Sequence, residues 1–173
     1  MILEARAMQQ KLKNKIFIVF LLLVLTGCQS KERIPTVGLP TTVTEVNLRP
    51  GISIRCKQEI QDNSIQKLEC IIQNDTEHKY SPQCHYALEY EQDGQWYCMN
   101  RSPSDKTFIE PELAWICHPY SEMDHTFWLE AYGTYFPSGH YRVIVTNGSW
   151  TDEETGLKYY HSDDMLSCEF YIE

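Results

Sequence analysis

The chain has 173 residues, of which 24 are acidic and 15 basic, giving a formal net charge of −9. A negative chain of this kind is repelled by nucleic acid and by anionic lipid surfaces, which argues against both as partners. It contains seven cysteines, so the redox state of its compartment matters for the fold.

The N-terminus has the three parts of a secretory signal. Three lysines (Lys11, Lys13, Lys15) precede ten unbroken apolar residues, Ile16 to Leu25. Ten residues span about 15 Å as a helix, half of a ~30 Å hydrocarbon core, which disfavours a membrane-spanning helix. Leu25-Thr26-Gly27-Cys28 resembles the bacterial lipobox. The resemblance implies cleavage before Cys28 and attachment of a diacylglyceryl group to its thiol. The alternative is an ordinary signal peptide with a coincidental cysteine.

Removal of residues 1–27 takes away four of the basic residues and one acidic residue, so the mature chain has a net charge of −12. We expect this chain outside the cytoplasm, anchored to the membrane through Cys28. Residues 28–47 are polar and threonine-rich with two prolines, and they predict a flexible tether. The folded domain is expected to span residues 48–173.

Period-2 alternation of apolar residues dominates the rest of the chain and predicts β-strands. Examples are Ile52 to Cys56, Leu68 to Ile72, Cys84 to Tyr90, Tyr141 to Val145 and Leu166 to Ile172. Turn signals recur about every ten residues, one of them at Gln92-Asp93-Gly94. This spacing predicts an all-β antiparallel sandwich of about seven strands.

Apart from Cys28, six cysteines stand in the same alternating rows as the large apolar residues. An even number in an exported chain points to disulfides. A turn centred on Asn63 places Cys56 opposite Cys70, which makes this the first expected pair. The sequence leaves the other pairs open, with Cys98–Cys117 and Cys84–Cys168 as guesses, and buried free thiols remain an alternative. Two Cys-His neighbours raise the question of zinc, but no metal-ligand spacing such as CxxC occurs. The six candidates are Cys56, Cys70, Cys84, Cys98, Cys117 and Cys168.

Three motifs in order resemble the bacterial immunoglobulin-like domain of Gram-positive lipoproteins. They are Ile72–Thr76 (IQNDT), Asp93–Tyr97 (DGQWY) and Phe136–Val143 (FPSGHYRV). The resemblance covers residues 48–173 and implies an immunoglobulin-like sandwich without established catalytic residues. In the third motif, Gly139 suits a tight turn, and Tyr141 is placed to bond back across it as a tyrosine corner does. The six extra cysteines and a long insertion after Val145 depart from the family pattern.

No nucleophile motif, phosphate-binding loop or dinucleotide fingerprint is present, so we expect neither an enzyme nor a cofactor, and no metal site. The insertion at residues 147–164 is too long for a hairpin turn, and loops of this length are often functional. One hypothesis makes it a binding loop; the other makes it a β-ribbon whose aromatic residues pack on their own hairpin. The candidate binding residues are Trp150, Asp152, Glu153, Glu154, Tyr159 and Tyr160.

Two functions remain open from the sequence. The favoured one is a non-catalytic surface module that binds a protein or envelope polymer, or has a structural role. The alternative is a secreted-enzyme inhibitor resembling the lysozyme-inhibitor lipoproteins, because an acidic anchored domain suits a basic enzyme.

Overall fold

The computed structural model describes residues 32–57, 59–82, 85–102, 115–145, 148–152, 154–160 and 165–173. The described residues belong to one unit, Glu32–Glu173. The signal segment with Cys28, and also Cys84 and Glu153, lie outside the described residues. Among the residues that are described, no helix is long and apolar enough to cross a membrane.

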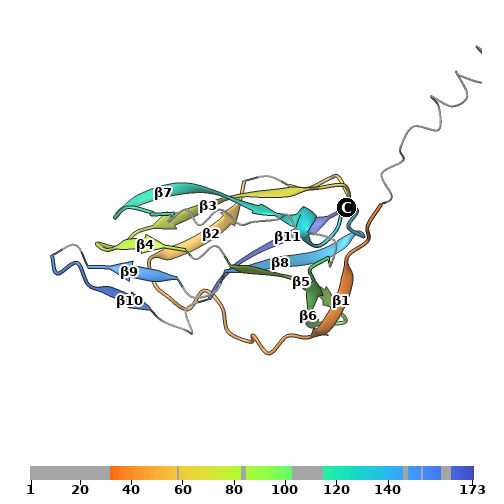
Figure 1. The fold of residues 1–173 in the computed structure, drawn as a ribbon, viewed down its shortest axis with the longest axis horizontal. Coiled ribbons are helices and arrows are strands. Elements are labelled where there is room, and N and C mark those ends of the chain that lie inside the picture. Colours follow the sequence, from red (N-terminus) through yellow and green to blue (C-terminus); the bar gives the residue numbers. More distant parts are fainter. Residues whose placement is uncertain are drawn as a thin grey trace, which may run out of the picture. The chain divides into compact units, whose positions relative to one another are not determined.

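Strands make up almost all of the regular structure in this part of the chain (Figure 1). In chain order they are β1 (Thr36–Pro40), β2 (Ile52–Cys56), β3 (Lys67–Asn74), β4 (Lys79–Ser81), β5 (Tyr86–Gln92), β6 (Gln95–Asn100), β7 (Ser121–Trp128), β8 (Gly139–Val145), β9 (Ser149–Thr151), β10 (Lys158–Tyr160) and β11 (Leu166–Ile172), with the single 3-10 turn η1 (Leu129–Ala131) after β7. The predicted all-β antiparallel class is confirmed.

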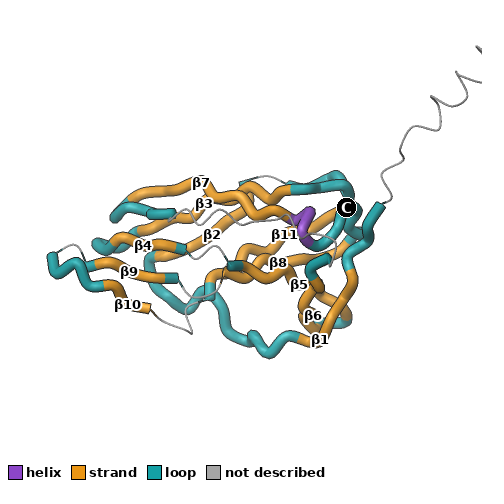
Figure 2. The backbone as a smooth tube through the Cα atoms, viewed as in Figure 1, coloured by secondary structure: helices purple, strands orange, loops and turns teal. Residues whose placement is uncertain are grey.

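The strands form three antiparallel sheets. The largest has the order β1-β6-β5-β8-β11, the second β2-β3-β7 and the third β10-β9-β4. The first two sheets stack as the layers of a sandwich (Figures 1 and 2). At one side of the sandwich, β2 and β11 are edge strands of different sheets and lie next to each other. This meeting of two edges is called the β2–β11 seam below.

The core lies between the two sheets and follows the alternation that the sequence shows. On β3, Leu68, Cys70 and Ile72 are buried and come from the same row. They join a single cluster with inward residues of the other sheet, such as Leu88 and Val143. Successive side chains of a strand point to opposite faces, so each strand contributes one row to this core.

The predicted hairpins and the tyrosine corner are present. Asp93 and Gly94, with φ of 54° and 79°, connect β5 to β6, as expected for a two-residue hairpin loop that needs positive φ twice. The Tyr141 hydroxyl donates to the Pro137 carbonyl at 2.7 Å. A side chain built on Gly139 would lie 2.6 Å from the ring of Tyr90, so close packing as well as the turn requires glycine there.

The prediction of a flexible tether up to residue 47 is corrected in its second half. Residues Thr36–Pro40 form β1, an edge strand paired with β6. Further along, the Asn47 side chain accepts from the Ser167 amide and donates to the Ser167 carbonyl. A strand with Gly38 and Pro40 has weak β-propensity, but an edge position needs hydrogen bonds on one side only.

Candidate functional site

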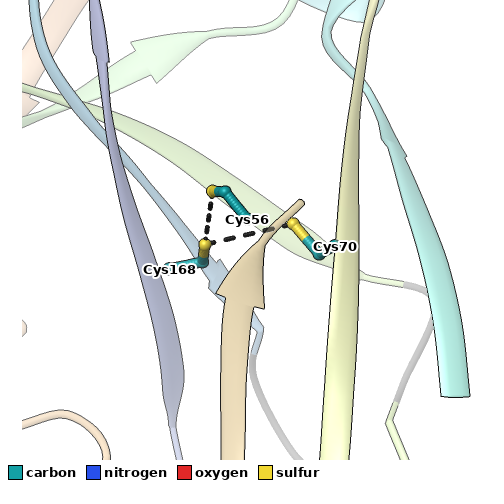
Figure 3. Close-up of side chains that lie close together, drawn as sticks. All are labelled: Cys56, Cys70 and Cys168. Atoms are coloured by element: carbon teal, nitrogen blue, oxygen red, sulfur yellow. Dashed lines mark hydrogen bonds between the residues drawn. The ribbon is translucent and has the colours of Figure 1, made fainter. Parts of the chain in front are cut away.

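Three of the six candidate cysteines lie together at the β2–β11 seam (Figure 3). The Cys56 sulfur is 2.6 Å from the Cys168 sulfur, and the Cys168 sulfur is 4.0 Å from that of Cys70. Cys56 is half-buried, whereas Cys70 and Cys168 are buried. These residues are called the three-cysteine cluster below.

The predicted register between the first two cysteines is confirmed. Cys56 pairs with Cys70 across β2 and β3, and the bond from the Lys57 amide to the Glu69 carbonyl belongs to the next pair. Because hydrogen-bonded and non-bonded pairs alternate, Cys56 and Cys70 form a non-hydrogen-bonded pair, whose side chains are the closer kind. The Cys56 sulfur nevertheless turns towards Cys168 on the opposite sheet.

The local sequence explains why all three thiols point inwards. Cys56 shares a row with Ile52 and Ile54, and Cys168 shares one with Phe170 and Ile172. A small, weakly polar thiol is readily buried among such residues. Because the two edge strands meet at the seam, their inward rows bring the sulfurs together.

Proximity couples the protonation of the three thiols. Hydrogen bonds from Cys168 and then from Cys70 lower the pKa of the Cys56 thiol. The contacts with Cys168 and Cys56, followed by burial, raise the pKa of Cys70. The contact with Cys56, followed by burial, raises the pKa of Cys168, an effect that the contact with Cys70 partly offsets. The cluster therefore loses a first proton more readily than an isolated thiol and later protons less readily, as interacting sites do.

The cluster has access to solvent through a groove. Its cavity volume is about 690 Å³, and both Cys56 and Cys168 line it. The other walls come from β2, β11 and the segment around Ile60, which bridges to Ile172. Thiolates are nucleophiles and soft metal ligands. The arrangement therefore suits disulfide chemistry, and its sulfurs all lie within 4.8 Å of one another, close enough to hold a thiophilic metal ion.

The other cysteines have different surroundings. Cys98 on β6 lies 3.8 Å from a Glu89 carboxylate oxygen, and burial followed by this negative charge raises the pKa of its thiol. Cys117 lies near the carbonyls of Ile72 and Ser121, and burial raises its pKa. The structure does not bring the guessed pair Cys98–Cys117 together. The guess Cys84–Cys168 lies partly outside the described residues.

A buried histidine occupies the same cross-strand row as the cluster. His125 on β7 pairs with Cys70 on β3, and its ring packs edge-on against Phe127 at 4.6 Å. Its Nδ1 atom has no hydrogen-bond partner among the described residues. Burial lowers the pKa of His125 to about 4, so the ring is neutral at pH 7.

The 147–164 insertion contains a β-ribbon, as the second hypothesis expected, but Trp150 packs on a residue outside its own hairpin. β9 and β10 pair with each other, and the Asp152 carboxylate accepts from the Glu154 and Thr155 amides at the turn. Trp150 is only 2% exposed, so its expected role as an exposed anchor is wrong. Its ring packs on Tyr80 of β4, and the Arg49 guanidinium lies over it. The sequence did not predict that β4 contacts the insertion.

The remaining binding candidates differ in their exposure to solvent. Glu154 is exposed and Asp152 is partly buried. Tyr159 and Tyr160 belong to β10, and their side chains are not among the described features.

The outward face of the large sheet carries a polar row that the sequence did not single out. Arg142 donates to Glu89 at 2.7 Å, and both side chains are buried. Arg142 also stacks on Trp96 and donates to the Val43 carbonyl. Beside it, His140 contacts Glu91 and Glu169. The sequence signal that could have revealed this row is the opposite charge of Glu89 and Arg142, which lie in the polar rows of two predicted strands.

These features define a class of protein: an immunoglobulin-like antiparallel sandwich with sulfur-containing core rows and a tyrosine corner. The family model of the bacterial Ig-like domain matches residues 48–159, and the chain belongs to this family. Neither the curated proteins nor the solved structures contain a match. Domains of this family are typical of surface or structural modules, and they are typically non-catalytic.

Proposed function

We propose that this protein is a lipid-anchored, extracytoplasmic module without catalytic activity, which binds a protein or polymer of the envelope or supports it structurally. Its membership in the bacterial Ig-like family, through the match to residues 48–159, carries the proposal. The signal-like N-terminus and the lipobox-like Leu25–Cys28 sequence supply the anchor.

A disulfide between Cys56 and Cys168 forms part of this proposal and replaces the pair Cys56–Cys70 expected from the sequence. The two sulfurs are 2.6 Å apart, so a small side-chain rotation brings them to the bonded distance of about 2.05 Å. The bond would join the two sheets at their edges. It would close a loop of 112 residues, for which the chain-entropy model gives a stabilisation of about 4–5 kcal/mol.

The end of the β9–β10 ribbon remains the proposed contact within the insertion. Glu154 and Leu157 are exposed there, Leu157 by 55%. They offer an acidic and an apolar contact on the same turn between β9 and β10. Burial of Trp150 removes one of the exposed aromatic contacts expected of the binding loop.

Two measurements test the proposal. Cells that make the protein are labelled with a fatty-acid analogue; we expect labelled protein in the membrane fraction and loss of label in Cys28→Ser, with Cys98→Ser as control. Unlabelled protein that remains in the cytosol would contradict the anchor.

A pull-down with the anchored protein, with lysozymes included among the ligands offered, tests binding. We expect an envelope component to be retained, and less of it by a Glu154→Lys, Leu157→Ser variant. Lysozyme capture that disappears in the same variant would favour the inhibitor alternative instead.

A further inference from the structure

We propose that the three-cysteine cluster is a thiol–disulfide exchange site, at which a low-molecular-weight thiol reacts with the Cys56–Cys168 disulfide while Cys70 remains a thiol. The inference rests on the disulfide in the proposed function and goes beyond it by assigning a reactant and a role to each sulfur.

The groove makes one of the three sulfurs the point of attack. Cys56 and Cys168 both line the groove, but Cys56 is half-buried whereas Cys168 is only 3% exposed. Cys70 is 0% exposed and does not line the groove. Disulfide exchange requires a thiolate to approach one sulfur of the bond, and access decides which sulfur it reaches. An incoming thiolate therefore meets the Cys56 sulfur first.

The exchange takes place in two steps. The thiolate forms a bond to the Cys56 sulfur, the Cys56–Cys168 bond breaks, and its electron pair leaves on the Cys168 sulfur. A second small thiol then attacks the mixed disulfide and releases the small disulfide and the Cys56 thiolate. Two small thiols are oxidised to one disulfide, and the protein disulfide is reduced. Of the two thiol protons, one passes to Cys168 and the other is released to solvent, because Cys56 remains a thiolate.

Cys70 acts as a positioning residue in this scheme. Its sulfur lies 4.0 Å from that of Cys168 and donates towards it. Neighbouring sulfurs and burial raise the pKa of Cys70, so it stays protonated and is a poor nucleophile. A protonated Cys70 stabilises the departing Cys168 thiolate, and groups that stabilise the reduced form make a disulfide more easily reduced.

The lowered pKa of Cys56 also favours the reduced form of the cluster. In the reduced cluster its thiolate accepts hydrogen bonds from both neighbours, which further stabilises the reduced form. The cluster thus combines an accessible sulfur, Cys56, with a leaving group, Cys168. The third thiol, Cys70, keeps its proton and donates a hydrogen bond to that leaving group.

The test uses the whole protein, purified in detergent without reductant and equilibrated in buffers of reduced and oxidised glutathione. After acid quenching and alkylation, peptide mass spectrometry measures each sulfur. We expect reversible reduction of a Cys56–Cys168 bond, glutathione attached transiently at Cys56, and Cys70 alkylated only after unfolding. Cys70→Ala should shift the equilibrium towards the disulfide about three- to tenfold, the value of one hydrogen bond. Cys70→Ser, which keeps a donor, should shift it less, and Cys98→Ala should not shift it.

Several results would overturn the inference. These are a Cys56–Cys70 bond, glutathione on another cysteine, a bond that glutathione does not reduce in the folded protein, or a bound thiophilic metal ion that protects all three thiols. If Cys70→Ala does not fold, the wild-type attachment site and reversibility still decide. The assay is independent of where the protein resides, so failed lipid labelling would contradict the anchor without affecting this result.

Discussion

The two faces of the five-stranded sheet handle buried polar groups in opposite ways. On the outward face, Arg142 and Glu89 are fully charged types that neutralise each other at 2.7 Å. On the inward face, Cys168 faces Cys56 and Cys70, which with His125 belong to the opposite sheet, β2-β3-β7. These groups are weakly polar, and burial or proximity shifts their protonation. Strong charge is tolerated inside a protein only with a partner, whereas soft groups are buried at lower cost and keep their reactivity. The outward ion pair therefore has a structural role, whereas the chemistry that we propose lies on the inward side.

Loss of the disulfide should have the largest effect. For Cys56→Ser we expect the free energy of unfolding of the oxidised protein to fall by about 4–5 kcal/mol, because the unfolded chain regains the freedom of the closed loop. Denaturant unfolding measures it. A reductant should lower the stability of the wild type to a similar value and leave that of Cys56→Ser unchanged. The control Cys98→Ser keeps the disulfide, so it should match the wild type both with and without reductant. Equal stability of the wild type with and without reductant would contradict the disulfide.

Removal of one partner of the buried ion pair should come next. Arg142→Met leaves Glu89 buried without its cation, and we expect a loss of about 3–5 kcal/mol in thermal or denaturant unfolding. The double variant with Glu89→Leu should recover most of this loss. The exposed pair of Arg55 and Glu122, at 3.2 Å, is the matched control, and Arg55→Ala should cost less than about 1 kcal/mol. A double variant no more stable than Arg142→Met would contradict the account.

The buried histidine predicts sensitivity to acid. The pKa of His125 is about 4 in the folded protein, against an ordinary value of 6.5. As the pH falls from 6.5 to 4, the unfolded chain takes up a proton that the folded protein does not, so stability decreases, by about 3 kcal/mol at pH 4. His125→Phe should remove that part of the decrease, and His78→Gln, at a partly exposed position, should not. Parallel pH profiles for His125→Phe and the wild type would count against a neutral buried ring.

The smallest effect should come from the tyrosine corner. Tyr141→Phe removes the hydrogen bond to the Pro137 carbonyl but keeps the ring, and we expect a loss of about 1 kcal/mol. The control is Tyr171→Phe, because Tyr171 is 63% exposed. Chemical denaturation of both variants checks the difference, and a loss no greater than that of Tyr171→Phe would show that the corner bond contributes nothing.

Local patterns were sufficient for much of the fold. The alternating rows gave the strand type, the Asp93-Gly94 turn gave a hairpin, and the spacing about Asn63 gave the Cys56–Cys70 register. These features depend on residues close in sequence. Prediction was weaker wherever an element depends on a distant partner, as with β1, whose pairing with β6 is a tertiary contact.

Prediction of the candidate site was likewise limited by contacts between residues that are distant in sequence. Alternation placed the thiols of Cys56, Cys70 and Cys168 on inward rows, but only the meeting of β2 and β11 decides that Cys56 faces Cys168. Likewise, the aromatic character of Trp150 was compatible with an exposed or a buried position. Its pairing through β9 with Tyr80 on β4 determines the outcome.

The most direct test of the central claim is disulfide mapping of the protein recovered from membranes with free thiols blocked at the moment of lysis. We expect one peptide pair joining Cys56 to Cys168, with Cys70 present as a thiol. A pair joining Cys56 to Cys70, or three blocked thiols at these positions, would contradict it.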